Sequence, residues 1–330
     1  MVTIADVAAR AEVSLGTVSR VLNHNPTVRP AMRKAVLAAI AELGYRPNIN
    51  ARNLRSAKTR VIGLLMGDLT QALSPLAIRG VEAAVQPRGY ALLIADGRGD
   101  PRVEREALEG LMARRVDGLL WFPVERRAAV EAAVAEVTVP VVLFGQTSPS
   151  KAVATAVVDE QSAIESMTAD LASLGHHSLG FVGTGLSAQG RLRRLTAACA
   201  LSGLERDPRF EAVLRSPRGT YDAVRTMLAA HPRPTALLAS PHDVVPDTLR
   251  AVRDAGMRLG RELSLVGFGD TDWAAAIDPP LNVITVDFGQ HGRDAAEVLL
   301  RYASGDESAP HTIHHQSVYI RRGSVGPACH

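Results

Sequence analysis

The 330-residue chain is 46% hydrophobic and 22% charged, which is typical of globular proteins and long enough for more than one domain. No apolar run approaches the roughly 18 residues that a membrane-spanning helix needs, and no export signal is evident, so we expect a cytoplasmic protein with no membrane partner. The net charge of +3 hides a basic head: residues 1–60 carry ten Lys or Arg against three acids, as is typical of a phosphate-binding module.

The first 22 residues predict two short helices separated by a tight turn. Thr3 and Asp6 form a capping box for the first helix, and Ser14 is placed to cap the second. The exposed side of the second helix carries small or hydrogen-bonding side chains and Arg20, which suits a helix lying in the DNA major groove, about 12 Å wide. A third helix from Pro30 to a stop at Gly44 completes a minimal core. A small helical cap on an enzyme is the alternative, and the basic charge counts against it.

Residues 46–56 have helical spacing, with Pro47 in the first turn. A helix of about ten residues is marginal by itself in water, because isolated helices need roughly 12–15 residues. By itself this segment is therefore expected to be only marginally helical.

From about residue 60 onward, short apolar runs alternate with helical stretches. The runs are V-I-G-L-L-M, A-L-L-I-A, G-L-L-W-F, V-V-L-F, L-G-F-V-G, A-L-L-A, S-L-V-G-F and V-I-T-V, followed by a last strand at 317–320. Continuous apolar strands indicate parallel sheets that are covered on both faces, as in a doubly wound α/β fold. The pattern recurs before and after Asp159, which predicts two similar lobes.

These segments together resemble the LacI/GalR family of bacterial transcriptional regulators. The resemblance is carried by T-I-A-D-V-A-x-x-A-x-V-S-x-x-T-V-S-R-V-L-N and G-Y-R-P-N, then by K-T-R-V-I-G-L-L, R-R-V-D-G-L-L, L-G-H-H-S-L-G-F-V-G, L-S-L-V-G-F-G-D-T and D-P-P-L-N-V-I. It covers essentially the whole chain.

The resemblance implies three regions. These are a helix-turn-helix domain over 1–46, a hinge helix over 47–58, and an effector-binding and dimerisation core over 59–330. Within the core, the N-lobe takes about 59–158 plus 287–315, and the C-lobe about 159–286 plus 316–330, in a fold like that of periplasmic sugar-binding proteins. The implied protein is a homodimer on a near-palindromic operator in double-stranded DNA, and by default a repressor.

For the head, the resemblance implies that Leu15, Gly16 and Arg20 face base edges. Arg20 can bind guanine O6 and N7 together, which is worth about 1–3 kcal/mol of discrimination. Leu54 of the hinge would wedge into the minor groove, although an ordinary linker leucine is the alternative. The full set of expected DNA contacts is Thr3, Ser14, Leu15, Gly16, Thr17, Ser19, Arg20, Asn23, Asn48, Ala51, Arg52, Leu54 and Arg55. Arg29 and Asn50 depart from the usual pattern, Arg29 because relatives place a helix cap there.

For the core, the resemblance implies a small-molecule effector in a cleft between the lobes. The expected effector contacts are Gln71, Ser74, Phe122, Gln146, Asp159, Ser187, Arg193, His242, Asp243 and Asp270. Arg193 is the expected grip on effector hydroxyls or carboxylates, with Arg191 and Arg194 as rivals. Gly145, Pro241 and Gly269 stand where relatives often carry polar ligands. We therefore expect an unusual effector, a sugar or a sugar-derived metabolite, with an anionic metabolite favoured over a neutral sugar. The alternative is a degenerate cleft that binds nothing tightly.

The sequence carries little evidence of an enzyme, a cofactor or a metal site. G-T-G-L-S-A-Q-G matches neither a dinucleotide nor a Walker loop, and no G-x-S-x-G is present. Cys199 and Cys329 form no C-x-x-C, as expected in a reducing cytoplasm, and the histidines at 176–177, 311 and 314–315 lack partners at metal-ligand spacing. We expect no enzyme and no cofactor. The remaining alternatives are an effector-independent DNA-binding regulator and a periplasmic-type binding protein.

Overall fold

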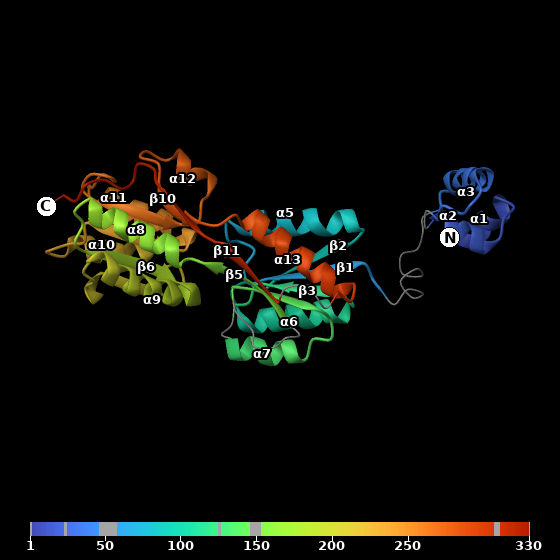
Figure 1. Cartoon of the computed structure of the whole chain (residues 1–330), viewed down its shortest axis with the longest axis horizontal. Helices are drawn as coiled ribbons and strands as arrows, with labels where there is room; N and C mark the ends of the chain where they lie inside the picture. The colour runs from blue at the N-terminus through green and yellow to red at the C-terminus, as the bar shows by residue number, and fades with distance from the viewer. Residues whose placement is uncertain are drawn as a thin grey trace. The chain divides into compact units, whose positions relative to one another are not determined.

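The computed structural model describes residues 2–22, 25–45, 58–124, 127–145, 153–306 and 311–329. It divides into two compact units, residues 1–59 and residues 60–330 (Figure 1).

The first unit is a three-helix head made of α1 (Ile4–Arg10), α2 (Leu15–Leu22) and α3 (Pro30–Leu43). Its core contains Val7, Val18 and Val36, one from each helix, and none of them has exposed surface. Burying a valine side chain completely contributes about 1.5–3 kcal/mol, so these three residues hold a small domain together. The helix α3 ends at Gly44, whose φ of +60° is a left-handed stop that favours glycine.

The N-lobe of the second unit is a six-stranded sheet in the order β11-β5-β4-β3-β1-β2. Every pairing in it is parallel. The strands are β1 (Val61–Met66), β2 (Ala91–Asp96), β3 (Gly118–Trp121), β4 (Val141–Phe144), β5 (Val153–Asp159) and β11 (Thr312–Gln316). Helices α5 (Ser74–Val85) and α13 (Phe288–Ala303) cover one face, and α6 (Pro101–Ala113) and α7 (Arg127–Ala135) cover the other (Figure 1).

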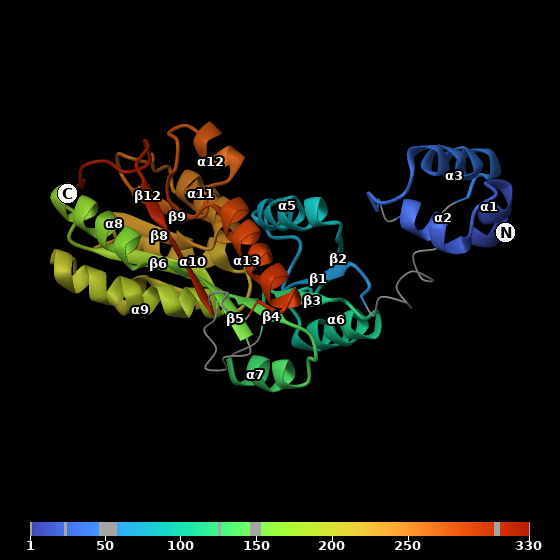
Figure 2. The same cartoon turned by 45° about the vertical axis from the view of Figure 1, so that its right-hand side comes forward.

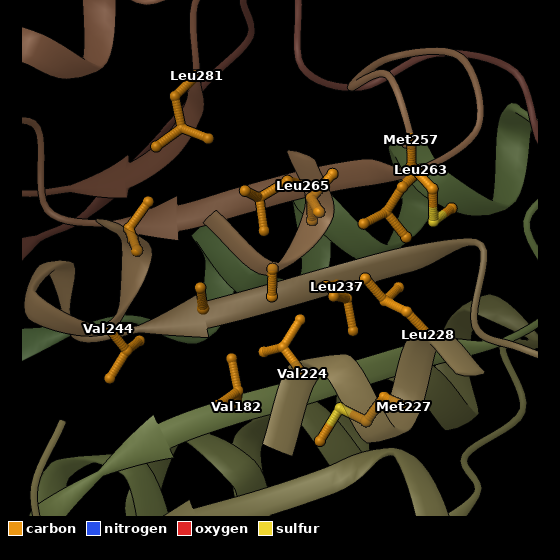
Figure 3. Packing of buried hydrophobic residues seen from close by; sticks show 14 of the residues in the cluster. Val182, Val224, Met227, Leu228, Leu237, Val244, Met257, Leu263, Leu265 and Leu281 are labelled. Atoms are coloured by element: carbon orange, nitrogen blue, oxygen red, sulfur yellow. The ribbon is translucent and has the colours of Figure 1, made fainter. Parts of the chain in front are cut away.

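The C-lobe repeats this plan in the order β12-β10-β9-β8-β6-β7, with only β12 antiparallel to its neighbour. Its strands are β6 (Leu179–Thr184), β7 (Glu211–Leu214), β8 (Ala236–Ser240), β9 (Ser264–Phe268), β10 (Asn282–Thr285) and β12 (Val318–Ile320). Helices α10 (Thr220–Ala229) and α11 (Val245–Asp254) pack on one face through the cluster seen in Figure 3, while α8 (Gln161–Ser173) and α9 (Gly185–Ser202) pack on the other. A short helix, α12 (Asp272–Ala276), and 3-10 turns at 208–210 and 242–244 lie in the connections of the C-lobe, and a 3-10 turn at 86–88 lies between α5 and β2 of the N-lobe.

The chain passes between the lobes three times: from β5 into α8, from β10 into α13, and from β11 into β12 (Figure 2). Two of these passages are tied together, because the Ser317 amide donates to the Asp159 carbonyl oxygen at 2.9 Å. In doubly wound folds, ligands bind beyond the carboxyl ends of the strands. The loops at those ends therefore define where to look for a site.

The predicted fold class, a helical head followed by two parallel α/β lobes, is confirmed. The eight apolar runs all form strands, but β5, β7 and β11 were not predicted. β7 and β11 are edge strands of their sheets. β7 reads E-A-V-L and β11 reads T-I-H-H-Q, so neither shows the continuous apolar run of a central strand. None of the helices in the part of the chain described above is long and apolar enough to cross a bilayer.

Candidate functional site

The outer surface of α2 is short and polar, with one apolar side chain at its start. Leu15 is 51% exposed, and Gly16 and Arg20 are also exposed. A side chain added at Gly16 would meet only the Ser14 hydroxyl, 3.7 Å away, so this part of the helix is open to close approach. Among the described residues, none bonds to the Arg20 guanidinium, which is therefore available to a ligand. A helix of this kind can enter a major groove with Leu15 and Arg20 leading.

Helix caps and one ion pair hold the helices of the head in place. The Thr3 hydroxyl accepts from the Asp6 amide at 3.3 Å. The Asp6 carboxylate accepts from the Thr3 amide and the Thr3 hydroxyl, both at 2.8 Å, and these two hydrogen bonds lower the pKa of Asp6. The Ser14 hydroxyl accepts from the Thr17 amide at 3.2 Å. Arg10 pairs with Glu42 at 2.7 Å and joins α1 to α3, a contact that the sequence analysis missed. The predicted capping box is therefore present at the start of α1, and Ser14 caps the start of α2.

Several predicted contacts lie outside the described residues. For DNA these are Asn23, Asn48, Ala51, Arg52, Leu54 and Arg55, and for the effector it is Gln146. Thr3, Ser14, Thr17 and Ser19 all lie at or near the start of α1 or on α2, and Ser19 is half-buried.

In the C-lobe, Arg191 is the arginine at the carboxyl ends of the strands. Its guanidinium donates to one oxygen of Glu160 at 2.7 and 3.0 Å and to the Ser240 hydroxyl at 3.0 Å. It also lies over the ring of Phe268, 4.0 Å from the centroid. The Arg191 side chain is 15% exposed and that of Glu160 is 11% exposed, so this is a largely buried pair. Glu160, Ser240 and Phe268 were missed, because only the placement of α9 shows which arginine turns inward.

Arg193, the predicted grip, lies exposed on α9, with no ion-pair or hydrogen-bond partner among the described residues. Ser187 is exposed near the start of the same helix. Arg194 is 42% exposed and reaches the second oxygen of Glu160 at 3.4 Å. Because Glu160 compensates both Arg191 and Arg194, the arginine cluster offers less free positive charge than its sequence indicates.

Two predicted acidic ligands are already engaged. Asp270 follows β9 and accepts two hydrogen bonds from Arg322, at 2.6 and 2.8 Å. Asp159 ends β5 and accepts from the Gln161 amide at 3.0 Å and the Gln316 side chain at 3.1 Å, and these bonds lower its pKa. Both carboxylates thereby help to fix the passages and loops at the boundary between the lobes.

The loop after β1 meets the loop after β8. The Ala72 amide donates to Nε2 of His242 at 3.0 Å, which joins the N-lobe to the C-lobe. Ser74 is buried and donates to the Asp68 carbonyl at 3.1 Å, while Gln71 is exposed. Burial raises the pKa of the neighbouring Asp243, and the charge of Asp68 raises it further; Oδ1 of Asp243 has no partner among the described residues. Residues from both lobes therefore converge here, as expected for a site between them.

Phe122 follows β3 and is part of an aromatic cluster. Its ring stacks on Phe144, with centroids 3.6 Å apart, and Phe144 meets His291 edge to face at 5.1 Å. His291 in turn meets His315 edge to face at 4.7 Å. Burial lowers the pKa of His291 to about 4. Neither histidine was predicted as a site residue, because His291 lies in α13 and His315 in β11, and no motif marks either position.

The geometry defines a class: a helical DNA-reading head joined to a two-lobed core of the kind that binds small molecules between its lobes. Within the described ranges, no three His, Cys, Asp or Glu side chains gather at ligand spacing.

Comparisons with known proteins agree with this class. A model for bacterial regulatory proteins of the lacI family matches residues 3–48, and one for a periplasmic binding protein-like domain matches residues 168–325. The HTH-type transcriptional regulator CelR of Thermobifida fusca is 30% identical over 323 residues, which cover 93% of this chain and 94% of CelR. Catabolite control protein A of Priestia megaterium is 28% identical over 313 residues, covering 91% and 92%.

Solved structures extend the likeness over both units. The complex of the transcriptional regulator CelR with cellobiose has a TM-score of 0.72 at 27% identity, covering 98% of this chain and 100% of that one. The lac repressor dimer bound to operator and the anti-inducer ONPF has a TM-score of 0.86 at 24% identity, covering 98% and 99%, and shows the common fold. The chain belongs to the LacI family of bacterial regulatory proteins. It is a DNA-binding transcriptional regulator and not an enzyme, as the sequence predicts.

Proposed function

We propose that this regulator binds a near-palindromic operator as a homodimer in the cytoplasm, and that a small metabolite bound between its lobes sets its affinity for that operator. Repression is the default outcome, because a protein seated on a promoter blocks it. The proposal that a bound metabolite sets operator affinity rests on the hydrogen bond from the Ala72 amide to His242. This bond joins the loops at the strand ends of the two lobes. Two similar structures, one of a regulator in complex with cellobiose and one of a repressor dimer bound to operator, support the same proposal.

The contacts proposed for the operator lie on α2 and at the start of α1, with Arg20 and Leu15 contacting bases, and with Thr17, Ser19 and Thr3 near phosphates. Arg20 is exposed and unbonded within the described head, so it can bind guanine without first breaking a contact. The hinge contacts, Leu54 above all, stay a prediction from the resemblance.

A second copy of the chain fits the outer edge of the N-lobe. Leu76 on α5 is 41% exposed and Ile94 on the edge strand β2 is 39% exposed. Edge strands with exposed apolar side chains are ready to pair, and natural proteins usually cover them. We therefore place the dimer contact on α5 and β2, in a two-fold dimer that matches the symmetry of a near-palindromic operator.

The effector we propose is a polar metabolite such as a sugar or sugar derivative. The prediction of an anionic effector rests on a cluster of arginines, and carboxylates compensate part of the positive charge of these arginines. Arg191 and Arg194 pair with Glu160, and Arg322 pairs with Asp270. A neutral sugar is therefore at least as good a candidate as a sugar acid.

Operator binding with and without metabolites tests this function. A thermal-shift screen of sugars, sugar acids, phosphosugars and nucleosides comes first, since a ligand at 100 times its Kd adds about 2.7 kcal/mol to native stability. Each hit is then titrated against labelled operator. A hit that changes operator affinity supports the proposal, and an operator affinity that no stabilising metabolite changes favours the effector-independent regulator.

A further inference from the structure

One loop of the N-lobe is docked on the C-lobe. The segment after β1 runs over Gly67–Leu73, and its Ala72 amide donates to Nε2 of His242 at 3.0 Å. Leu73, the next residue, is only 7% exposed. The loop also has its own supports: the Leu69 amide donates to Asp96 at 3.1 Å. It is therefore an ordered segment whose tip crosses to the other lobe.

Gly269 provides the place for Leu73. A Cβ at Gly269 would lie 2.6 Å from Cδ1 of Leu73 and 3.4 Å from Cβ of His242, so a side chain there would collide with the leucine. The φ of Gly269 is +92°, a conformation that favours glycine. The end of β9 thus forms a notch, walled by His242, that holds an apolar side chain from the other lobe.

His242 must be neutral to accept the Ala72 hydrogen bond at Nε2, and its surroundings keep it so. The residue is 6% exposed. Burial lowers the pKa of His242, and the nearby positive charge of Arg191 lowers it further. The charged groups around this contact also include Asp243, next to it in the chain, and Asp68, which acts on Asp243 from the loop of the N-lobe. At neutral pH the acceptor is therefore available.

We propose that Ala72 and Leu73 form a latch that holds the two lobes together by docking on His242 and Gly269. The latch lies among the residues predicted to bind the effector, so an effector entering between the lobes must displace it. This second statement rests on the proposed function, whereas the latch itself does not.

Release of the latch has a direct route to the dimer surface. The latch leads straight into α5, which begins at Ser74. Helix α5 packs so closely on α13 that a Cβ at Gly80 would overlap the carbonyl of Gly289, and Figure 2 shows the two helices side by side. A loop released from the C-lobe therefore frees the start of a helix whose outer face carries Leu76, where we place the second copy. Interfaces with two discrete arrangements are the usual carriers of such coupling.

Hydrogen exchange of the full-length protein without added ligand tests the latch at its own hydrogen bond. The Ala72 amide should be protected, and His242→Ala should speed its exchange roughly tenfold, the change expected when one hydrogen bond is lost. Leu69 and Thr70 are internal references, because their amides bond to Asp96 and Asp68 within the N-lobe. Unchanged exchange at Ala72 in His242→Ala would overturn the proposal.

Two further variants separate the latch from general damage. Leu73→Ala should also speed Ala72 exchange, whereas Leu201→Ala, the same change at a leucine that is 77% exposed, should not. If His242→Ala loosens β1 as well, His242→Gln decides, because glutamine keeps an acceptor: protection of Ala72 restored supports the latch, and protection still lost overturns it.

Operator affinity measured on the same variants tests the coupling. Leu73→Ala should change effector-free operator affinity at least about threefold, while Leu201→Ala should leave it unchanged. Fast Ala72 exchange with unchanged operator affinity would refute the route through α5. If no metabolite alters operator affinity, the proposed gating fails, yet the ligand-free exchange result still decides the latch.

Discussion

Acid should destabilise the N-lobe through one residue, His291. This histidine on α13 is 3% exposed, its Nδ1 has no partner among the described residues, and burial together with His315 lowers its pKa to about 4. Folding therefore favours the neutral ring. The ordinary pKa of the unfolded residue is 6.5, so stability from this group is fully present above pH 6.5 and is lost as pH falls toward 4. The lowering of the His291 pKa from 6.5 to about 4 corresponds to about 3 kcal/mol of stability.

Urea unfolding between pH 4 and pH 7.5 measures this loss. Trp121 in β3 is 3% exposed and reports on the N-lobe once Trp273 of the C-lobe is replaced by phenylalanine. In that background, His291→Phe keeps a ring against Phe144 and removes the titrating group, so the free energy of unfolding should depend less on pH by up to about 3 kcal/mol. The same change at His177, which is exposed, controls for the loss of a histidine. Equal acid sensitivity in His291→Phe and its parent would refute the reasoning.

Four other changes test the account. Arg20→Ala should cost about 1–3 kcal/mol per half-site on operator and much less on random DNA, and an equal loss on both in an anisotropy titration would argue against base contact. Thr3→Ala should lower head stability by about 1 kcal/mol in thermal unfolding, unless the capping box contributes nothing. Arg191→Ala should cost about 3 kcal/mol, because it leaves Glu160 largely buried and poorly compensated, and Arg191→Met with Glu160→Gln should recover most of it; no recovery would mean that charge is not the cause. Ile94→Asp should shift sedimentation from dimer to monomer, and an intact dimer would move the contact elsewhere.

The head and the central strands can be predicted from the sequence, because they depend on interactions between residues that are close together in the chain. Thr3, Asp6 and Gly44 act within one turn of chain, and each does what its spacing predicts. The run V-I-G-L-L-M is buried along nearly all its length, so its composition shows its place in the sheet. β11 pairs only with β5 and carries two histidines, and its strand character comes from that partner.

The core site is harder to predict, because it depends on how helices are turned and on what lies across the boundary. Successive residues of a helix are turned by about 100°, so Arg191, Arg193 and Arg194 point in different directions from α9. Only the packing of α9 decides that Arg191 meets Glu160. The contact from Ala72 to His242 joins residues 170 positions apart, which no local pattern can indicate. In the sequence, Gly269 is notable only because relatives often carry a polar ligand at that position. Its role in making room for Leu73 depends on a contact between the lobes.

The central claim is that the head reads a specific DNA sequence, and one measurement tests it most directly. The full-length protein is used to select duplexes from a random pool, and its affinity for the selected duplex is compared with that for a shuffled one at the same physiological salt. We expect a palindromic consensus bound at least about 10³-fold more tightly than the shuffled duplex. Equal affinity for the two, or a selection that yields no consensus, would contradict the account.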